Sequence, residues 1–477
     1  MMVQTFQPMI ALHRFFSAGF PLLLAAGQAS AATSGSFTYV DNGGNITITR
    51  CSNVAGAVSV PDSIDGKPVV RIADGAFGSR SAITGVTIPD SVVSIGNDAF
   101  AYCSGLSSIV IPESVTTLGT GVFRNCSSLQ SVSLPSGLAA VPNSTFTYCS
   151  ALVSFSFPAA AESIGSYSFY YCPNLQNVIL PQGLESIGSQ AFASCGKLSS
   201  IEIPDSVSSI GKYAFVSCHG LTAIHLPQGL KELEQGVLSD CAGLTEVEVP
   251  SAVERLGVEC FGDCPKLRKV VLPQSLKRVD GAFGNCPSLR TVRFPAGLRK
   301  LSIWAFAHSA VEKIHFFGPA PEFLDGDTFY EVPETFQTFF VDGKKGFTWP
   351  TWGGFPATPL GPEIMLSGPD DVPITTRVST QHFGARVKGY KRGKTFTIRN
   401  IGTKTLKGLS TVVLDSPDGD FTCTEPLRTS LAPGQSTVFR VLFQPTDDGR
   451  RHAVLKIRSN DANENPVTIK LSGLGMK

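Results

Sequence analysis

A 23-residue periodicity dominates the chain from about residue 77 onward. Phenylalanine, proline and cysteine each recur at this spacing and keep one phase relative to one another over more than two hundred residues. One step, between the last two full repeats, is 22 residues long. Such self-similarity predicts a solenoid in which each repeat forms one coil. The phenylalanine positions are Phe77, Phe100, Phe123, Phe146, Phe169, Phe192, Phe215, Phe261, Phe283 and Phe306, with Leu238 in the remaining slot.

The unit Gly105–Pro112 shows the physical logic of one repeat. Leu106, Ile109 and Ile111 are placed to point inward, and small or polar residues alternate with them, as in the short strand of a leucine-rich repeat. Pro112 ends the strand because proline has no N–H to donate to a ladder. One coil cannot bury its own apolar face, so coils must stack. With about 4.8 Å per strand, about eleven coils form a rod roughly 50 Å long.

The sequence motif of the repeat resembles that of a known family. The pattern Ile-Pro-x-Ser-Val-x-x-Ile-Gly-x-x-Ala-Phe-x-x-Cys-x-x-Leu is cleanest at residues 88–106 and 203–221. It closely resembles the BspA-like surface leucine-rich repeats, over about residues 36–360 when caps are included. Residues 37–48 look like that family's first hairpin, and residues 318–354 look like its final cap. The resemblance implies surface exposure and an adhesion-type role, with varied ligands.

The pattern changes after Pro362. Strand-like runs at residues 394–399, 436–443 and 453–457 are separated by clusters of Gly, Pro and Asn. About 115 residues of short alternating strands predict an immunoglobulin-like β-sandwich.

This second region also resembles a family. Phe383-Gly384, residues 397–400, residues 431–434, Phe443-Gln444-Pro445 and residues 459–461 look like the choice-of-anchor D domains of secreted bacterial proteins, kin of the ASH sandwiches. In that family the domain often precedes an anchoring tail. This chain departs from the pattern because it stops at Lys477, so attachment to a surface stays open. The ASH kinship alone would indicate a ciliary or centrosomal protein, and the bacterial-type repeats argue against that.

The N-terminus is typical of an export signal. His13 and Arg14 precede an apolar run of about ten residues, and Ala29-Ser30-Ala31 fits a cleavage site. A buried N-terminal helix is the alternative; the run is too short to span a bilayer, and no other segment is apolar enough. The predicted organisation is a signal peptide at 1–31, an entry cap at 32–70, repeats at 71–316, a C-terminal solenoid cap at 317–361 and the sandwich at 362–477.

The twelve cysteines raise the question of disulfides, because export implies an oxidising route. Nine lie in the repeat ladder, where stacked side chains point in parallel and their Cβ atoms stay about 4.8 Å apart, wider than a disulfide prefers. We therefore expect buried thiols that act as small hydrophobic side chains. Cys260 has the spacing to pair with Cys264, and Cys51 and Cys423 lie outside the ladder; the redox state of Cys51, Cys260 and Cys423 stays open. The ladder is Cys103, Cys126, Cys149, Cys172, Cys195, Cys218, Cys241, Cys264 and Cys286.

The seven histidines form no metal-ligand spacing, and the sequence contains no nucleophile elbow, P-loop or dinucleotide fingerprint. The prediction is a non-enzymatic protein with no catalytic residue, no cofactor and no metal site.

Charge is distributed unevenly along the repeats. Residues 81–181 contain Arg124 as their only basic residue, residues 182–265 contain 4 basic and 11 acidic residues, and residues 266–315 contain 10 basic and 2 acidic residues. If outward positions stack from coil to coil, the last group forms one basic patch, which indicates either an anion-binding surface or a solvated face balanced by the adjacent acidic coils. A role in nucleic-acid binding is disfavoured because no stacking aromatics accompany the patch. The patch residues are Arg268, Lys269, Lys277, Arg278, Arg290, Arg293, Arg299, Lys300, Lys313 and His315.

Together these observations predict an exported surface or extracellular scaffold that recognises a protein or a glycan. Two alternatives remain: a structural envelope component without a discrete ligand, and an extracellular enzyme acting on polysaccharide.

Overall fold

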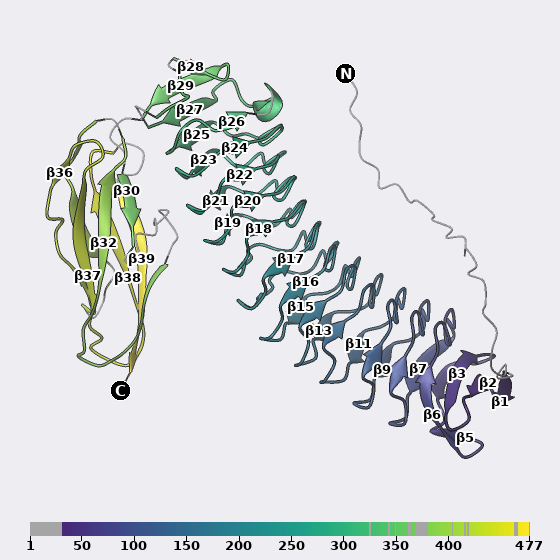
Figure 1. Ribbon diagram of the computed structural model, residues 1–477. Helices are drawn as coiled ribbons and strands as arrows, with labels where there is room; N and C mark the ends of the chain where they lie inside the picture. The colour runs from purple at the N-terminus through teal and green to yellow at the C-terminus, as the bar shows by residue number, and fades with distance from the viewer. Residues whose placement is uncertain are drawn as a thin grey trace.

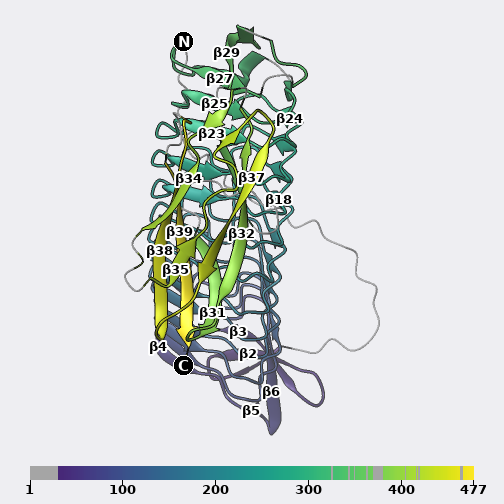
Figure 2. The same ribbon diagram turned by 90° about the vertical axis from the view of Figure 1, so that its left-hand side faces the viewer.

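The computed structural model describes residues 31–476 except 324–325, 342–343, 349, 361–363, 369–379, 403, 415, 417–418 and 462–465. The predicted export signal lies outside the described residues, apart from Ala31. The described chain forms a stack of about 13 β-coils. A sandwich of two sheets, whose strands are mostly antiparallel, follows the stack and lies beside its last coils (Figures 1 and 2). Both predicted fold classes are confirmed.

Most coils contribute one short strand to each of two parallel series, and an isolated bridge between Glu202 and His225 continues the first series where it has no strand. In the coil that contains residues 105–112, β9 (Ser108–Val110) belongs to the first series and β10 (Thr117–Leu118) belongs to the second. The first series also contains β4 (Gly56–Ser59), β7 (Ile83–Thr87), β11 (Ser131–Ser133), β13 (Ser154–Ser156), β15 (Asn177–Ile179), β19 (Glu246–Glu248), β21 (Lys269–Val271), β23 (Thr291–Phe294), β25 (Lys313–Phe316), β27 (Gln337–Phe340) and β29 (Phe355–Pro359). The second contains β6 (Lys67–Ile72), β8 (Ser94–Ile95), β12 (Ala140–Val141), β14 (Ser163–Ile164), β16 (Ser186–Ile187), β17 (Ser209–Ile210), β18 (Glu232–Leu233), β20 (Arg255–Leu256), β22 (Arg278–Val279), β24 (Lys300–Leu301) and β26 (Glu322–Phe323).

The predicted alternation within a coil is confirmed. Leu106, Ile109 and Ile111 are buried, whereas Val110 is 67% exposed. Strand β9 pairs in parallel with β7 and with β11, so each coil covers the apolar edge of its neighbours. This pairing is why a repeat that could not fold alone is stable in the stack.

The repeating phenylalanines form the interior column that their spacing predicts. Phe100, Phe123, Phe169, Phe192 and Phe215 are fully buried. Adjacent rings of the column have centroids 4.9–5.7 Å apart, from Phe77 and Phe100 at 4.9 Å to Phe100 and Phe123 at 5.7 Å. Offset stacking at this separation is the arrangement that aromatic rings prefer. Leu238 occupies one slot, and the stack resumes at Phe261.

The ladder cysteines are buried thiols, as expected. Each ladder thiol donates to a backbone carbonyl one coil earlier, that of Leu238 for Cys264 and that of a phenylalanine for the others; for example, the Sγ of Cys126 lies 3.1 Å from the Phe100 oxygen. Cys260, Cys264, Cys51 and Cys423 are also free in the structure. Burial raises the pKa of the Cys103 thiol to about 11, which disfavours the reactive thiolate.

The stack of coils extends at both ends beyond the residues that follow the 23-residue period. The predicted entry hairpin is present, and its last strand pairs in parallel with β6. At the other end, β27 and β29 extend the parallel pairing from β25, and Trp352 packs on Phe316. The additional elements are β1 (Ala32–Ser34), β2 (Phe37–Asp41), β3 (Ile46–Cys51), β5 (Ser63–Ile64), η1 (Gly326–Phe329) and β28 (Thr351–Trp352).

The sandwich has its own core, separate from that of the coils. One sheet has the order β30-β32-β37-β35, and the other has the order β31-β39-β38-β34. The three predicted strand runs lie within β32, β37 and β38. The bounds are β30 (Ile364–Ser367), β31 (Thr380–Val387), β32 (Arg392–Asn400), β33 (Leu406–Lys407), β34 (Ser410–Leu414), β35 (Phe421–Cys423), β36 (Ser430–Leu431), β37 (Ser436–Phe443), β38 (Gly449–Arg458) and β39 (Val467–Met476).

Candidate functional site

The predicted basic patch is divided between two faces of the solenoid. Arg278 and Lys300 lie in β22 and β24 of the second series, beside Lys277 and Arg299, and not in turns next to the first-series strands. Lys269 and Lys313 lie in the first series, in β21 and β25. The expectation that stacking gathers all ten residues on one surface is therefore wrong, because each coil folds between its two strands and presents them on different sides.

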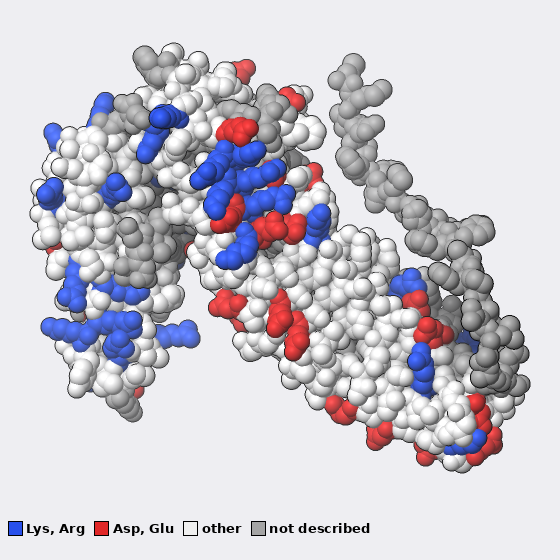
Figure 3. Space-filling model, in the orientation of Figure 1, with Lys and Arg blue, Asp and Glu red and all other residues white. Residues whose placement is uncertain are grey.

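On the second-series face, the basic side chains form a ladder that begins and ends with a carboxylate. Cross-strand neighbours run Glu232, Arg255, Arg278, Lys300 and Glu322. The first and last pairs are ion pairs, with nitrogen–oxygen distances of 3.0 Å from Arg255 to Glu232 and 3.5 Å from Lys300 to Glu322. Figure 3 shows blue and red side chains interleaved on these coils.

Asp280 joins the middle of this ladder. Its side chain is only 4% exposed, and it accepts hydrogen bonds from the Nε of Arg255 at 2.9 Å and the Nε of Arg278 at 2.6 Å. The bond to Asp280 is the largest cause that raises the pKa of Arg255 above its usual range. A second pair, Lys277 with Glu254 at 2.7 Å, lies beside the ladder. Most basic side chains on this face therefore have a carboxylate partner within the coils themselves.

On the first-series face, Lys269 and Lys313 do not lie in a column of like charge. Lys269 lies opposite Glu246, and Lys313 lies opposite Thr291 and Gln337. Arg290 pairs with Glu312 at 3.2 Å. The neutral neighbours of Lys313 and the ion pair of Arg290 therefore reduce the contact between like charges in this series.

His315 is not an exposed cation, and the interpretation of it as part of the patch is wrong. The residue is only 2% exposed, and its ring stacks on Phe339 with centroids 4.9 Å apart. Burial, followed by the charges of Arg293 and Lys313, lowers the pKa of His315 to about 3. The side chain is neutral at pH 7 because the strand turns it into the core at the C-terminal end of the stack.

The structure reveals a surface that the sequence interpretation missed, in the turns that close the coils. Two positions in each coil adopt a positive φ, which repeats from coil to coil. Many carry Gly, Asn, Asp or Ser, which tolerate this conformation, but five carry large aromatic side chains that are 40–56% exposed. A left-handed conformation costs a bulky residue roughly 1–2 kcal/mol. These residues are Tyr102, Tyr148, Tyr167, Tyr171 and Trp304.

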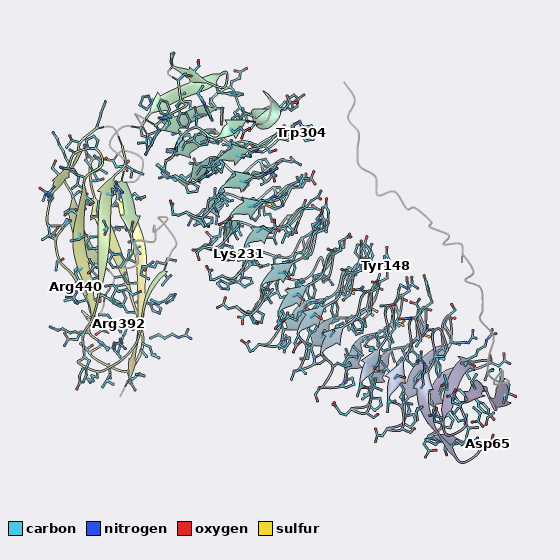
Figure 4. The ribbon with its side chains drawn as sticks, viewed as in Figure 1. Asp65, Tyr148, Lys231, Trp304, Arg392 and Arg440 are labelled. Carbon is cyan, nitrogen blue, oxygen red and sulfur yellow. The ribbon has the colours of Figure 1, made fainter. Side chains whose placement is uncertain are left out.

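Three of these tyrosines, with half-buried Tyr170, form a cluster that we call the tyrosine ridge. The ring centroid of Tyr148 lies 5.2 Å from that of Tyr171 and 5.5 Å from that of Tyr170, which lies 5.8 Å from Tyr167. Gln190 donates a hydrogen bond to the Tyr167 hydroxyl at 3.0 Å. Figure 4 shows Tyr148 and Trp304 along the same edge of the solenoid. The sequence signal was present as tyrosines at two fixed repeat positions, next to the buried Phe and Cys columns.

An open groove lies on the second-series face of the middle coils, with a volume of about 490 Å³. Serines and glycines of β14, β16, β17 and the turns that follow them line most of it, and Lys231 and Glu232 lie at one end. The groove offers hydroxyl groups and little charge.

Within the described part of the chain, no cluster of three or more His, Cys, Asp or Glu side chains has metal-binding geometry. No described helix is long and apolar enough to cross a membrane.

Comparisons with solved structures find bacterial leucine-rich-repeat proteins. A leucine-rich cell surface protein from Faecalibacterium prausnitzii is 23% identical, with a TM-score of 0.48, covering 70% of this chain and 99% of that one. A leucine-rich repeat protein from Bacteroides ovatus is 23% identical, with a TM-score of 0.45, covering 66% and 92%. The pneumococcal vaccine antigen PcpA is 18% identical, with a TM-score of 0.40, covering 66% and 94%. All three TM-scores are below 0.5, so nothing further follows from these likenesses. A search of curated proteins found no match.

Two family models match the chain. Residues 375–474 match the HYDIN/CFA65/VesB-like, Ig-like domain, which supports the immunoglobulin-like fold but not the choice-of-anchor D assignment specifically. The BspA type leucine rich repeat region matches in segments that together run from residue 70 to residue 330. Because this second match spans more than half of the 477 residues, the chain belongs to the BspA-type leucine-rich repeat family.

Proposed function

We propose that this protein is an exported, non-catalytic surface scaffold whose solenoid recognises a protein or glycan through the tyrosine ridge. The observation that carries this proposal is the exposure of aromatic side chains on a backbone conformation that disfavours them. Exposed aromatic clusters mark interaction sites, and tyrosine is enriched in recognition surfaces because its ring is rigid, broad and polar at one end.

The backbone conformation adds to this argument. Positions equivalent to Tyr148 and Tyr171 in neighbouring coils hold Asn125, Ser194 and Ser217, at φ values of 58–61°. The fold therefore accepts small polar residues at these turns, and the tyrosines do not serve the turn itself. Backbone strain of this kind concentrates at functional sites, where another requirement compensates for it.

The surroundings of the ridge also favour recognition without strong charge. The ridge lies in coils of residues 144–190, where the sequence is serine-rich and nearly uncharged. We therefore expect binding that changes little between low and moderate salt, because screening acts on charges.

The test uses the chain from Ala32 onward on a glycan array and, in parallel, on an array of purified extracellular proteins. Tyr148→Ser with Tyr171→Ser should lose the binding of the parent that persists at moderate salt, and Val110→Ser with Ile179→Ser, which removes two exposed apolar side chains from the first-series strands, should retain it. Circular dichroism checks that both double variants are folded. Absence of any binder on both arrays would contradict the proposal and favour the structural envelope component.

A further inference from the structure

The outer face of one sandwich sheet concentrates basic side chains. Along β38, Ala453, Leu455 and Ile457 are buried in the core, and Arg450 and His452 lie on the opposite, exposed face. The strand alternation that builds the sandwich core therefore also sets the spacing of these two residues.

The neighbouring strands continue this face. His452 lies opposite Ser472 of β39, which in turn lies opposite His382 of β31. The Ser472 hydroxyl and the Nδ1 of His382 are 2.6 Å apart. Two residues before Ser472 on the same strand, Lys470 lies opposite Val454 and Thr380. The result is a row of imidazoles and a hydroxyl across three strands, with a basic side chain on either side.

These basic residues differ from Arg255, Arg278 and Lys300 of the coils because they lack carboxylate partners. Among the described residues, neither Arg450 nor Lys470 has an Asp or Glu oxygen within ion-pair distance. Arg451, the next residue along β38, shows the contrast: it points inward and pairs with buried Asp420 at 3.0 Å. Figure 3 shows Lys and Arg side chains on the sandwich with few acidic side chains beside them.

The face is also hollowed. An open depression of about 890 Å³ is lined by His382, Arg450, His452, Lys470 and Ser472, among other residues. Its lining contains no Asp or Glu and no Phe, Tyr or Trp. Unpaired basic side chains around a concave surface raise the local concentration of anions.

We propose that this sheet face binds an acidic polysaccharide, with Arg450 and Lys470 contacting carboxylates and the His382–Ser472–His452 row contacting sugar hydroxyls. A linear polymer fits because the donors are spread over three strands, and no single small anion could contact them all. Single-stranded nucleic acid fits less well because it requires aromatic side chains on which bases stack. A protein partner fits less well because stable protein interfaces have an apolar centre. This site is independent of the tyrosine ridge.

The experiment measures retention of the chain from Ala32 onward on immobilised polygalacturonate, with neutral dextran as the reference matrix. Arg450→Ser with Lys470→Ser should weaken binding to polygalacturonate by about tenfold at low salt, since two exposed charge contacts are lost. Lys407→Ser with Arg428→Ser removes the same charge elsewhere on the sandwich and should leave binding within about twofold of the parent, because distant exposed charges are screened. The tyrosine ridge variant should bind like the parent, which separates this proposal from the proposed function.

Equal retention of the two charge variants would overturn the proposal, because the effect would then depend on net charge alone. Binding of single-stranded DNA as tight as that of polygalacturonate, and equally sensitive to Arg450→Ser with Lys470→Ser, would also overturn it and would assign the face to polyanions in general. Loss of binding confined to the Arg450 and Lys470 variant, with no retention on dextran, is the expected result.

Discussion

The coils and the sandwich both carry many basic side chains, but the neighbours of these side chains differ between the two regions. In the coils, Arg255 and Arg278 share the buried carboxylate of Asp280, and Lys277 lies against Glu254. On the sandwich sheet, Lys470 lies opposite Val454 and Thr380, with no carboxylate partner among the described residues.

The difference follows from which parts of the sequence become cross-strand neighbours in the two folds. In a solenoid each residue lies about 4.8 Å from its counterpart in the next coil, so a basic position that repeats faces another basic residue unless a carboxylate intervenes. In the sandwich, neighbouring strands come from unrelated parts of the sequence, so a basic residue can lie between neutral ones. A repeated basic position is therefore stabilised by a carboxylate nearby, whereas the sandwich sheet leaves Arg450 and Lys470 without a carboxylate partner among the described residues.

The largest effect is expected for a substitution in the buried column of phenylalanine rings. Phe192→Ala should lower the free energy of unfolding by about 3–5 kcal/mol, because a fully buried ring is removed and its neighbours Phe169 and Phe215 lose their stacking partner. Phe192→Leu imitates the natural Leu238 slot and should cost less than about 1.5 kcal/mol. Denaturant unfolding measures both. Similar losses for the two variants would show that column packing does not govern coil stability.

The next effect compares a buried histidine of the coils with an exposed one of the sandwich. The folded-state pKa of His315 is about 3, below its ordinary value of 6.5, so the unfolded chain takes up the proton first. Stability is therefore lost as pH falls from about 6.5 toward 3, by up to about 1.4 kcal/mol per pH unit. His315→Phe should remove this loss between pH 6.5 and 5. His452→Phe is the control, and an equal change in that variant would contradict the assignment.

A smaller effect tests the compensation within the coils. Asp280→Asn should cost about 1–2 kcal/mol, because two charge-assisted hydrogen bonds are weakened while their arginine partners remain half-exposed. The same variant should increase retention on polygalacturonate, because it exposes uncompensated basic side chains. Unchanged stability and unchanged retention together would mean that Asp280 does not balance this face.

The smallest effect concerns the basic coils as an anion site. Replacing Arg268, Lys269, Arg290 and Arg293 with Ser should change retention on polygalacturonate by less than about twofold at moderate salt, since exposed charges on a convex surface are screened and contribute little. Arg450→Ser with Lys470→Ser should have the larger effect although it removes fewer charges. If the coil variant loses more binding than the sandwich variant, the basic coils are the anion-binding surface after all.

Local patterns in the sequence predicted the core of the fold well. The Phe and Cys columns, the inward positions Leu106, Ile109 and Ile111, and the strand runs of the sandwich were all predictable, because burial follows hydrophobic periodicity within a short window. The candidate sites were less predictable. The turn tyrosines occupy repeat positions that also hold Ser and Asn, so the repeated sequence pattern alone did not show that these positions would present a cluster of exposed rings.

The sequence by itself determined the coil, its interior and the order of the domains, because these depend on spacings within one repeat or one strand. Only the tertiary structure decided which charges meet. It placed Arg278 and Lys269 on different series, buried His315 against Phe339, and brought β31 beside β39, about ninety residues later, to complete the basic face. The physical reason is that a contact between strands depends on register and on the direction in which each side chain leaves its sheet, and neither is encoded within a single short stretch of sequence.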